Sequence, residues 1–203
     1  MSEPGFIHEF VPGTSPRTLL LLHGTGGNEH QLLGLGRELD AEAALLSPRG
    51  KILEHGAPRF FRRLAEGVFD EEDVVARAHE LADFVRQSIT QYQIDADRLI
   101  AVGYSNGANI AAAMMLLGIA PFKKGIFLRP MVPLSNIAPF DLTNSAVLLS
   151  AGRFDPIAAL SIVQQLTDLL RKAGATVDLV VQQSGHELTA EDVETAQRWM
   201  AAF

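Results

Sequence analysis

Three residues of this chain have the types and the order that acyl transfer requires: Ser105, Asp155 and His186. Ser105 is the centre of the Gly-x-Ser-x-Gly segment 103–107, which fits a sharp strand-to-helix turn because glycine leaves room for neighbouring backbone. A serine hydroxyl is a weak nucleophile until a base takes its proton. The chain order Ser, Asp, His therefore predicts that His186 is this base and that Asp155 orients its imidazole.

Each of these residues also has an ordinary interpretation when it is considered alone. Asp155 precedes Pro156, and such a pair is typical of a turn or a helix cap. His186 follows Gly185, and Gly-His is common in loops. The joint placement of all three residues after successive predicted strands favours catalysis over three unrelated loops.

Acyl transfer also needs N–H donors aimed at the oxyanion of the tetrahedral intermediate. The main-chain amide of Asn106, directly after the serine, is one candidate. The amide of Thr25 is the second, because the glycines of segment 23–27 let the backbone approach a substrate. The alternative for this loop is a phosphate cradle, but it lacks the Gly-Lys-Ser/Thr ending and the dinucleotide fingerprint.

Strands and helices alternate along the chain and must position these residues. Short apolar runs predict strands, and apolar residues at helical spacing predict helices between them. Asn28 and the pair Thr189 and Asp192 have the residue types of helix N-caps. The expected strands cover 18–22, 43–46, 98–102, 125–128, 146–151 and 177–181, with 6–11 as an antiparallel edge strand.

This alternation predicts an α/β fold in one domain over residues 1–203, with a mostly parallel central sheet and helices on both faces. A chain of this size leaves no room for a separate cap domain. The functional crevice of such a sheet lies beyond the carboxyl ends of its strands. The loops there carry Thr25, Arg49, Ser105, Arg129, Asp155 and His186.

The motifs His23-Gly24-Thr25-Gly26-Gly27, Gly103 to Gly107, Asp155-Pro156 and Gly185-His186 resemble the phospholipase/carboxylesterase family of α/β hydrolases. Segments 47–50, 58–64 and 69–73 are similar to those of bacterial carboxylesterases associated with hydroquinone resistance. The resemblance covers nearly the whole chain and implies an α/β-hydrolase fold, a serine esterase activity and a homodimer. The acyl-protein thioesterase branch typically has Phe and Gln beside the serine, where this chain has Tyr104 and Asn106.

Segment 51–70 is the one long excursion beyond the predicted strand ends, and it combines aromatic residues with arginines. One interpretation is a flap that lines a substrate pocket. The other is a docked loop whose arginines pair with Glu66, Asp70 and Glu71 in solvent. The candidate pocket residues are Phe60, Phe61, Phe69 and Met131.

Composition excludes several classes of protein. The net charge of -7, with 17 basic and 24 acidic residues, disfavours nucleic acid as a partner. The absence of cysteine excludes disulfides, thiolate metal sites and a cysteine nucleophile. We expect no cofactor and no metal, no signal peptide and no membrane insertion, and therefore a cytoplasmic protein.

The sequence thus favours a serine carboxylesterase that acts on short to medium acyl esters of a small molecule. A thioesterase or a lysophospholipase with the same three residues is the related alternative. A non-catalytic ligand-binding protein on the same scaffold is the alternative from a different class, because fold alone carries no function.

Overall fold

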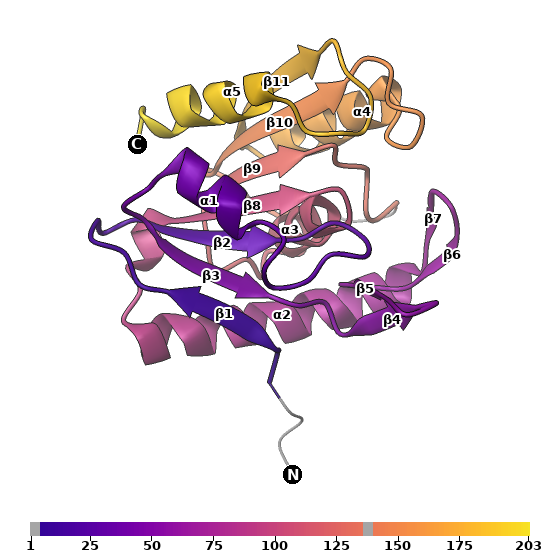
Figure 1. The fold of residues 1–203 in the computed structure, drawn as a ribbon. Helices are drawn as coiled ribbons and strands as arrows, with labels where there is room; N and C mark the ends of the chain where they lie inside the picture. The colour runs from indigo at the N-terminus through magenta and orange to yellow at the C-terminus, as the bar shows by residue number, and fades with distance from the viewer. Residues whose placement is uncertain (1–4, 136–139) are drawn as a thin grey trace.

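The structure is a computed structural model that describes residues 5–135 and 140–203. Within this part of the chain, seven strands form one sheet in the order β1-β3-β2-β8-β9-β10-β11 (Figure 1). All neighbouring strands are parallel except β1 and β3, so the predicted edge strand is confirmed. The strands are β1 (His8–Val11), β2 (Thr18–Leu22), β3 (Ala44–Pro48), β8 (Leu99–Tyr104), β9 (Lys124–Leu128), β10 (Ala146–Gly152) and β11 (Thr176–Gln182).

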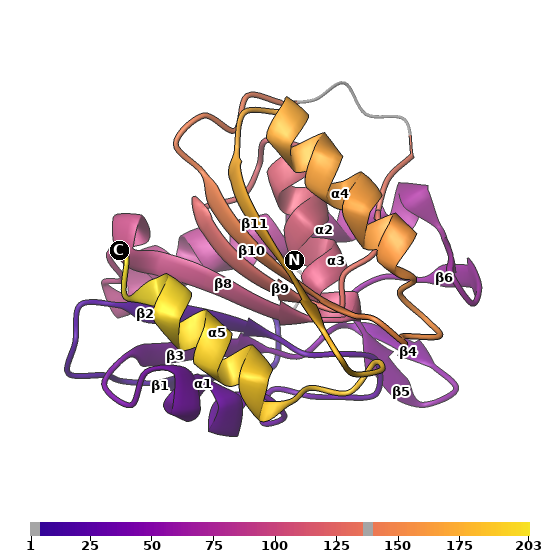
Figure 2. The same ribbon diagram turned by 90° about the horizontal axis from the view of Figure 1, so that it is seen from above.

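Helices cover both faces of the sheet, as Figure 2 shows. One face carries α2 (Glu71–Tyr92), α3 (Asn106–Leu116) and α4 (Leu160–Lys172). The other face carries α1 (Leu33–Leu39) and α5 (Ala190–Met200). A short 3₁₀ helix, η1 (Ala96–Arg98), precedes β8. The predicted α/β fold with helices on both faces is confirmed, and none of the described helices is long and apolar enough to cross a bilayer.

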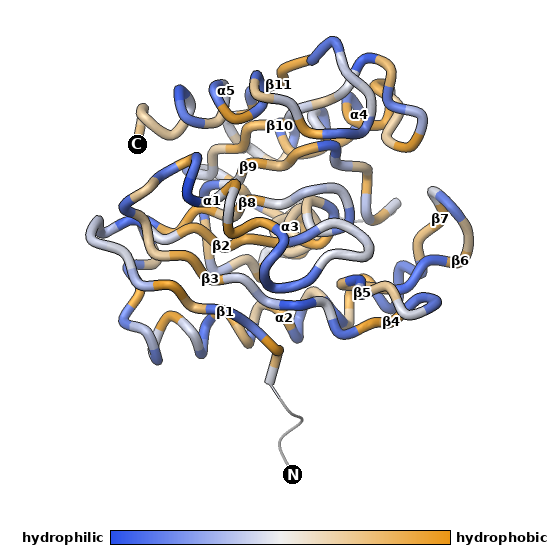
Figure 3. Tube along the Cα trace, viewed as in Figure 1, coloured by the Kyte–Doolittle hydropathy of each residue, from blue (hydrophilic) through white to orange (hydrophobic). Residues whose placement is uncertain are grey.

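Strand β2 shows why its residues form a central strand. Leu20 and Leu22 pack in the core beneath α2, α3 and α4, whereas Leu19 and Leu21 pack in the second core beneath α1 and α5. All four side chains are fully buried, as a continuous apolar run in a parallel sheet predicts. Figure 3 shows the same pattern, with hydrophobic colour along the central strands.

One predicted helix cap differs from the structure, and the other is confirmed. Asn28 does not cap α1, because its side chain accepts from the amide of His30 in a turn that precedes the helix. At the start of α5, Thr189 and Asp192 form the predicted capping box. A capping side chain reaches only two or three residues along the chain, so a single intervening turn moves the helix start away from it.

Segment 51–70 is not an irregular loop. It folds into two short antiparallel hairpins, β4 (Ile52–Glu54) with β5 (Ala57–Arg59), and β6 (Arg63–Ala65) with β7 (Val68–Phe69). Both hairpins lie beside the carboxyl ends of the parallel strands (Figure 1). Strands of two or three residues are too short to show a period-2 pattern, and the sequence therefore did not reveal them.

Candidate active site

Ser105 occupies a strained turn between β8 and α3. Its φ of 51° and ψ of -112° are unfavourable for a residue with a side chain, and such strain is typical of functional sites. A Cβ atom on Gly103 would lie 2.6 Å from Cα of Ala108, and one on Gly107 would lie 2.0 Å from the carbonyl oxygen of Leu22. Both glycines are therefore required by the close approach of backbone, as the sequence predicted.

The structure brings the three predicted side chains together. Nε2 of His186 lies 3.0 Å from Oγ of Ser105, and Nδ1 of the same ring lies 2.7 Å from Oδ2 of Asp155. The Asp155 carboxylate is fully buried and the imidazole is mostly buried, with 18% of its side chain exposed. A serine hydroxyl, an imidazole and a buried carboxylate in this contact order can pass a proton from the hydroxyl to the ring.

The carboxylate of Asp155 makes the contacts that both interpretations of the sequence require. Its Oδ1 accepts from the amides of Ile157 and Ala158 at 2.8 and 2.9 Å, so it caps the turn after β10. Its Oδ2 faces His186. The turn therefore holds the carboxylate at the angle that the imidazole needs, and the turn interpretation does not compete with the catalytic one.

The glycine-rich loop after β2 offers one unoccupied amide. Gly24 donates to Oε1 of Gln31, Gly26 donates to the carbonyl of Pro58, and Gly27 donates to the carbonyl of Gly24. Among the described residues, the amide of Thr25 has no acceptor, and neither has the amide of Asn106. A phosphate cradle needs several free amides, so this loop is suited to one donor rather than to a phosphate.

His23 anchors the glycine-rich loop through two hydrogen bonds of its ring. Its Nε2 accepts from the amide of Gly50 at 2.9 Å, so its Nδ1 carries the proton that it shares with the carbonyl of Gly24 at 2.7 Å. Burial lowers the pKa of His23 below its ordinary value, which keeps the ring neutral. The neutral ring ties the loop of Thr25 to the segment that follows β3.

A cavity of about 290 Å³ lies beside Ser105. The predicted pocket residues Phe69 and Met131 line it, together with both candidate oxyanion residues. The other lining residues are Arg59, Arg63, Glu66, Gly67, Tyr104, Asn109, Ile157 and His186.

The prediction that Phe60 and Phe61 line the pocket is corrected by the structure, because both side chains are buried in the core. Phe60 packs against the ring of His23, with centroids 4.7 Å apart, and its amide donates to Oδ1 of Asn106. Phe61 packs edge-on against Phe69. The two rings therefore support the walls of the site from behind.

The arginines of the hairpins differ in their surroundings. Arg62 does not line the cavity and pairs with Asp70 at 3.1 Å, as the docked-loop interpretation predicts. Arg59 and Arg63 line the cavity and share Glu54, each at 2.8 Å, which is a partner that the sequence did not suggest. The segment therefore places two arginines at the cavity and pairs the third with an acidic residue, while a flap over substrate stays a prediction.

Arg129 is a functional candidate to which the sequence assigned no role. Its side chain is fully buried and donates to the carbonyls of Gly185 and Glu187, the two neighbours of His186. It also forms a two-pronged ion pair with Asp192, at 3.0 and 2.8 Å. An arginine directly after a buried strand is unusual, and that position was the available signal.

Tyr104 also holds the loop that carries His186, residues 183–187, which we call the histidine loop. The hydroxyl of Tyr104 donates to the carbonyl of His186 at 3.1 Å. Burial raises the pKa of Tyr104 above its ordinary value, so this hydroxyl keeps its proton. The histidine loop is therefore fixed by side chains from two neighbouring strand ends, β8 and β9.

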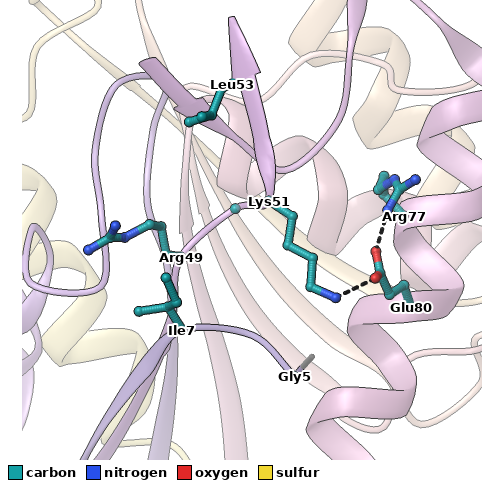
Figure 4. Close-up of a pocket in the computed structure, with 8 residues that line it drawn as sticks. Gly5, Ile7, Arg49, Lys51, Leu53, Arg77 and Glu80 are labelled. Atoms are coloured by element: carbon teal, nitrogen blue, oxygen red, sulfur yellow. Dashed lines mark hydrogen bonds and ion pairs between the residues drawn. The ribbon is translucent and has the colours of Figure 1, made fainter. Parts of the chain in front are cut away.

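A second cavity of about 510 Å³ lies near the start of β1 and contains none of the predicted site residues (Figure 4). Its charged groups are already paired, with Lys51 and Arg77 both bound to Glu80. Within residues 5–135 and 140–203, no three potential metal ligands are grouped together. The cavity beside Ser105 is therefore the place where the chemical groups converge.

Comparison with known proteins gives consistent matches. A family model described as phospholipase/carboxylesterase matches residues 12–203. A Bacillus subtilis protein named "Putative hydrolase MhqD" is 47% identical over 192 residues, which are 95% of this chain and 96% of that protein. The structure of a Bacillus cereus carboxylesterase superimposes with a TM-score of 0.95 at 42% identity, over 99% of this chain and 96% of that one. A carboxylesterase from Mesorhizobium loti superimposes with a TM-score of 0.94 at 29% identity, over 100% and 98%.

Proposed function

The chain belongs to the phospholipase/carboxylesterase family of α/β hydrolases, and from this premise we propose that it is a serine carboxylesterase. We propose that it hydrolyses short to medium acyl esters through an acyl intermediate on Ser105. The observation that carries the proposal is the continuous contact from Ser105 through His186 to Asp155, at 3.0 and 2.7 Å.

In the first step, the hydroxyl of Ser105 attacks the ester carbonyl while Nε2 of His186 takes its proton. Asp155 keeps the imidazole in the tautomer with the proton on Nδ1 and stabilises the imidazolium that forms. His186 then returns the proton to the leaving alcohol, and the acyl group remains on Ser105. Water attacks the acyl-enzyme in the second step by the same route, and the acid is released.

The amides of Thr25 and Asn106 are proposed to bind the oxyanion in both steps. Each is free of an acceptor among the described residues, and both residues line the cavity beside Ser105. One such donor typically contributes about 3 to 4 kcal/mol to transition-state stabilisation. A backbone donor that is already in place costs no reorganisation when the charge develops.

The size of the cavity supports small substrates. A volume of about 290 Å³ is at the lower end of the range for small-molecule sites, which is roughly 300 to 1,000 Å³. The same groups would also act on thioesters and lysophospholipids, because the attacked carbonyl is equivalent. A panel of esters, acyl thioesters and lysolipids with varied acyl length separates these substrates.

Covalent labelling tests the proposal directly. A fluorophosphonate probe should label the protein, and Ser105→Ala should abolish both labelling and hydrolysis of 4-nitrophenyl acetate and butyrate. Ser88→Ala is a matched control, since it removes one serine hydroxyl that bonds only within α2, to the carbonyl of Phe84, and leaves the nucleophile in place. The proposal fails if wild-type protein neither labels nor hydrolyses these esters while a reference esterase does.

A further inference from the structure

Arg59 has the surroundings of a residue that binds substrate. It ends β5, it lines the cavity beside Ser105, and only 3% of the residue is exposed. Arginine is rarely buried to this extent unless its charge is paired. A buried guanidinium needs an acceptor for each of its N–H donors.

The partners of Arg59 within the described chain do not satisfy all of its donors. Nε of Arg59 donates to the carbonyl of Phe61 at 3.2 Å, and Nη1 donates to Oε2 of Glu54 at 2.8 Å. Nη2 makes no hydrogen bond to any residue that the structure describes. Among the described residues, Nδ2 of Asn106 is the only side-chain nitrogen or oxygen atom that is fully buried and has no hydrogen-bond partner. Nη2 of Arg59 has no partner either, so it is not fully buried. Arg59 therefore keeps free N–H groups on a side chain that lines the cavity beside Ser105.

The charge around Arg59 is not balanced by its acidic partner. Glu54 is shared with Arg63, so one carboxylate faces two guanidinium groups. Glu66 also lines the cavity, but it is exposed, and water screens its charge. Burial lowers the pKa of Arg59 below its ordinary value, yet a guanidinium keeps its proton at any physiological pH.

We propose, resting on the esterase function above, that Arg59 determines specificity by binding a carboxylate or another anionic oxygen of the ester substrate. The planar guanidinium is suited to such an oxygen, and a charge-assisted hydrogen bond is strengthened where water is excluded. The substrate class is thus a small ester that carries an acidic group on its acyl or its alcohol part.

Two pairs of substrates test whether the acidic group belongs to the acyl part or to the alcohol part of the ester. The mono-4-nitrophenyl ester of adipic acid is compared with 4-nitrophenyl hexanoate, which has the same acyl length without the charge. 4-Acetoxybenzoate is compared with 4-acetoxybenzamide, which places the difference on the leaving alcohol. In wild-type protein, kcat/KM for the anionic member of one pair should exceed that of its neutral partner about tenfold, the effect of one charge-assisted hydrogen bond.

Arg59→Met should reduce this ratio to about one by removing the charge-assisted hydrogen bond. Arg62→Met is the matched control, because Arg62 lies three residues further along the same segment, pairs with Asp70 and does not line the cavity. In Arg62→Met, the ratio of kcat/KM for the anionic ester to that for the neutral ester should equal the ratio in wild type. If Arg59→Met does not fold, competition in wild-type protein replaces it: adipate should inhibit hydrolysis of the neutral ester, and adipamide should not.

Failure of this inference is separable from failure of the esterase proposal. If the neutral esters are hydrolysed in a Ser105-dependent way but neither anionic ester is preferred, Arg59 does not bind an anionic group of the substrate and the inference is overturned. A preference that persists in Arg59→Met overturns it equally. If no ester is hydrolysed and Ser105 does not label, the esterase function itself is refuted.

Discussion

The ion pair between Arg129 and Asp192 should determine both the stability of the fold and the position of His186. The perturbation is the replacement of one partner at a time, Arg129→Met or Asp192→Leu. Neither side chain has more than 2% of its surface exposed, so either change leaves an uncompensated charge in the interior. Arg129→Met also removes the donors for the carbonyls on both sides of His186.

The expected loss of stability follows from this burial. Removal of one partner of a buried ion pair costs about 3 to 5 kcal/mol. For a domain of this size each kcal/mol lowers Tm by about 2 to 4 °C, so Tm should fall by roughly 6 to 20 °C. A domain with a stability of about 5 to 15 kcal/mol would still fold at 20 °C in most of this range.

The double variant Arg129→Met/Asp192→Leu separates stability from positioning. Replacing both charges with apolar side chains of similar size removes the uncompensated charge, and such replacements are often neutral for stability. The carbonyls of Gly185 and Glu187 remain without their donor, however. Asp192→Leu also removes the capping contact of Asp192 with the amide of Thr189, so we expect Tm to recover only in part. The value of kcat should stay at least about tenfold lower while KM changes little, as for a mispositioned base.

The assays are thermal unfolding by circular dichroism and steady-state hydrolysis of 4-nitrophenyl butyrate at a temperature below every Tm. The proton on Nδ1 of His186 gives a second measurement, because its NMR resonance reports the hydrogen bond to Asp155 without turnover. Single variants whose Tm stays within 2 °C of wild type, an interval of about 1 kcal/mol or less, would refute the energetic reasoning. A double variant with wild-type kcat and an unchanged Nδ1 proton would refute the positioning role.

Other substitutions test separate parts of the structure. Gly107→Ala should prevent correct folding or abolish activity, because its Cβ would lie 2.0 Å from the carbonyl oxygen of Leu22; soluble yield and labelling of Ser105 measure this. Tyr104→Phe removes one hydrogen bond to the carbonyl of His186 and should lower the unfolding free energy by about 1 kcal/mol, measured by urea denaturation. Hydrogen bonds from Arg49 lower the pKa of Glu29 to about 2, so this carboxylate stabilises the fold above its ordinary pKa of 4.5 and the contribution disappears as the pH falls toward 2. Glu29→Gln should flatten the loss of stability between pH 4.5 and 2; an unchanged acid-unfolding curve would contradict the assignment.

Several elements could be predicted because their information is local. The apolar run of β2 was predicted with its observed bounds, and the cap of α5 was predicted from Thr189 and Asp192. Burial on both faces leaves only apolar residues in such a strand, and a capping box spans four residues. The hairpins of segment 51–70 could not be predicted, because their short strands are held by contacts with Asp73, Asn106 and Glu54 rather than by a period.

The sequence by itself determined the fold class, the strand-to-helix turn at Ser105 and the order of the three candidate catalytic residues. Each of these depends on neighbours in the chain, such as the two glycines that the turn requires. The tertiary structure decided which side chains touch, since His186 meets Ser105 across 81 residues and Asp155 across 31. It also decided that Phe60 and Phe61 pack in the core beside the site, that Arg59 lines the cavity, and that Arg129 holds the backbone on both sides of His186. Such contacts depend on how distant strand ends and hairpins pack together, and residue type and spacing do not encode that packing locally.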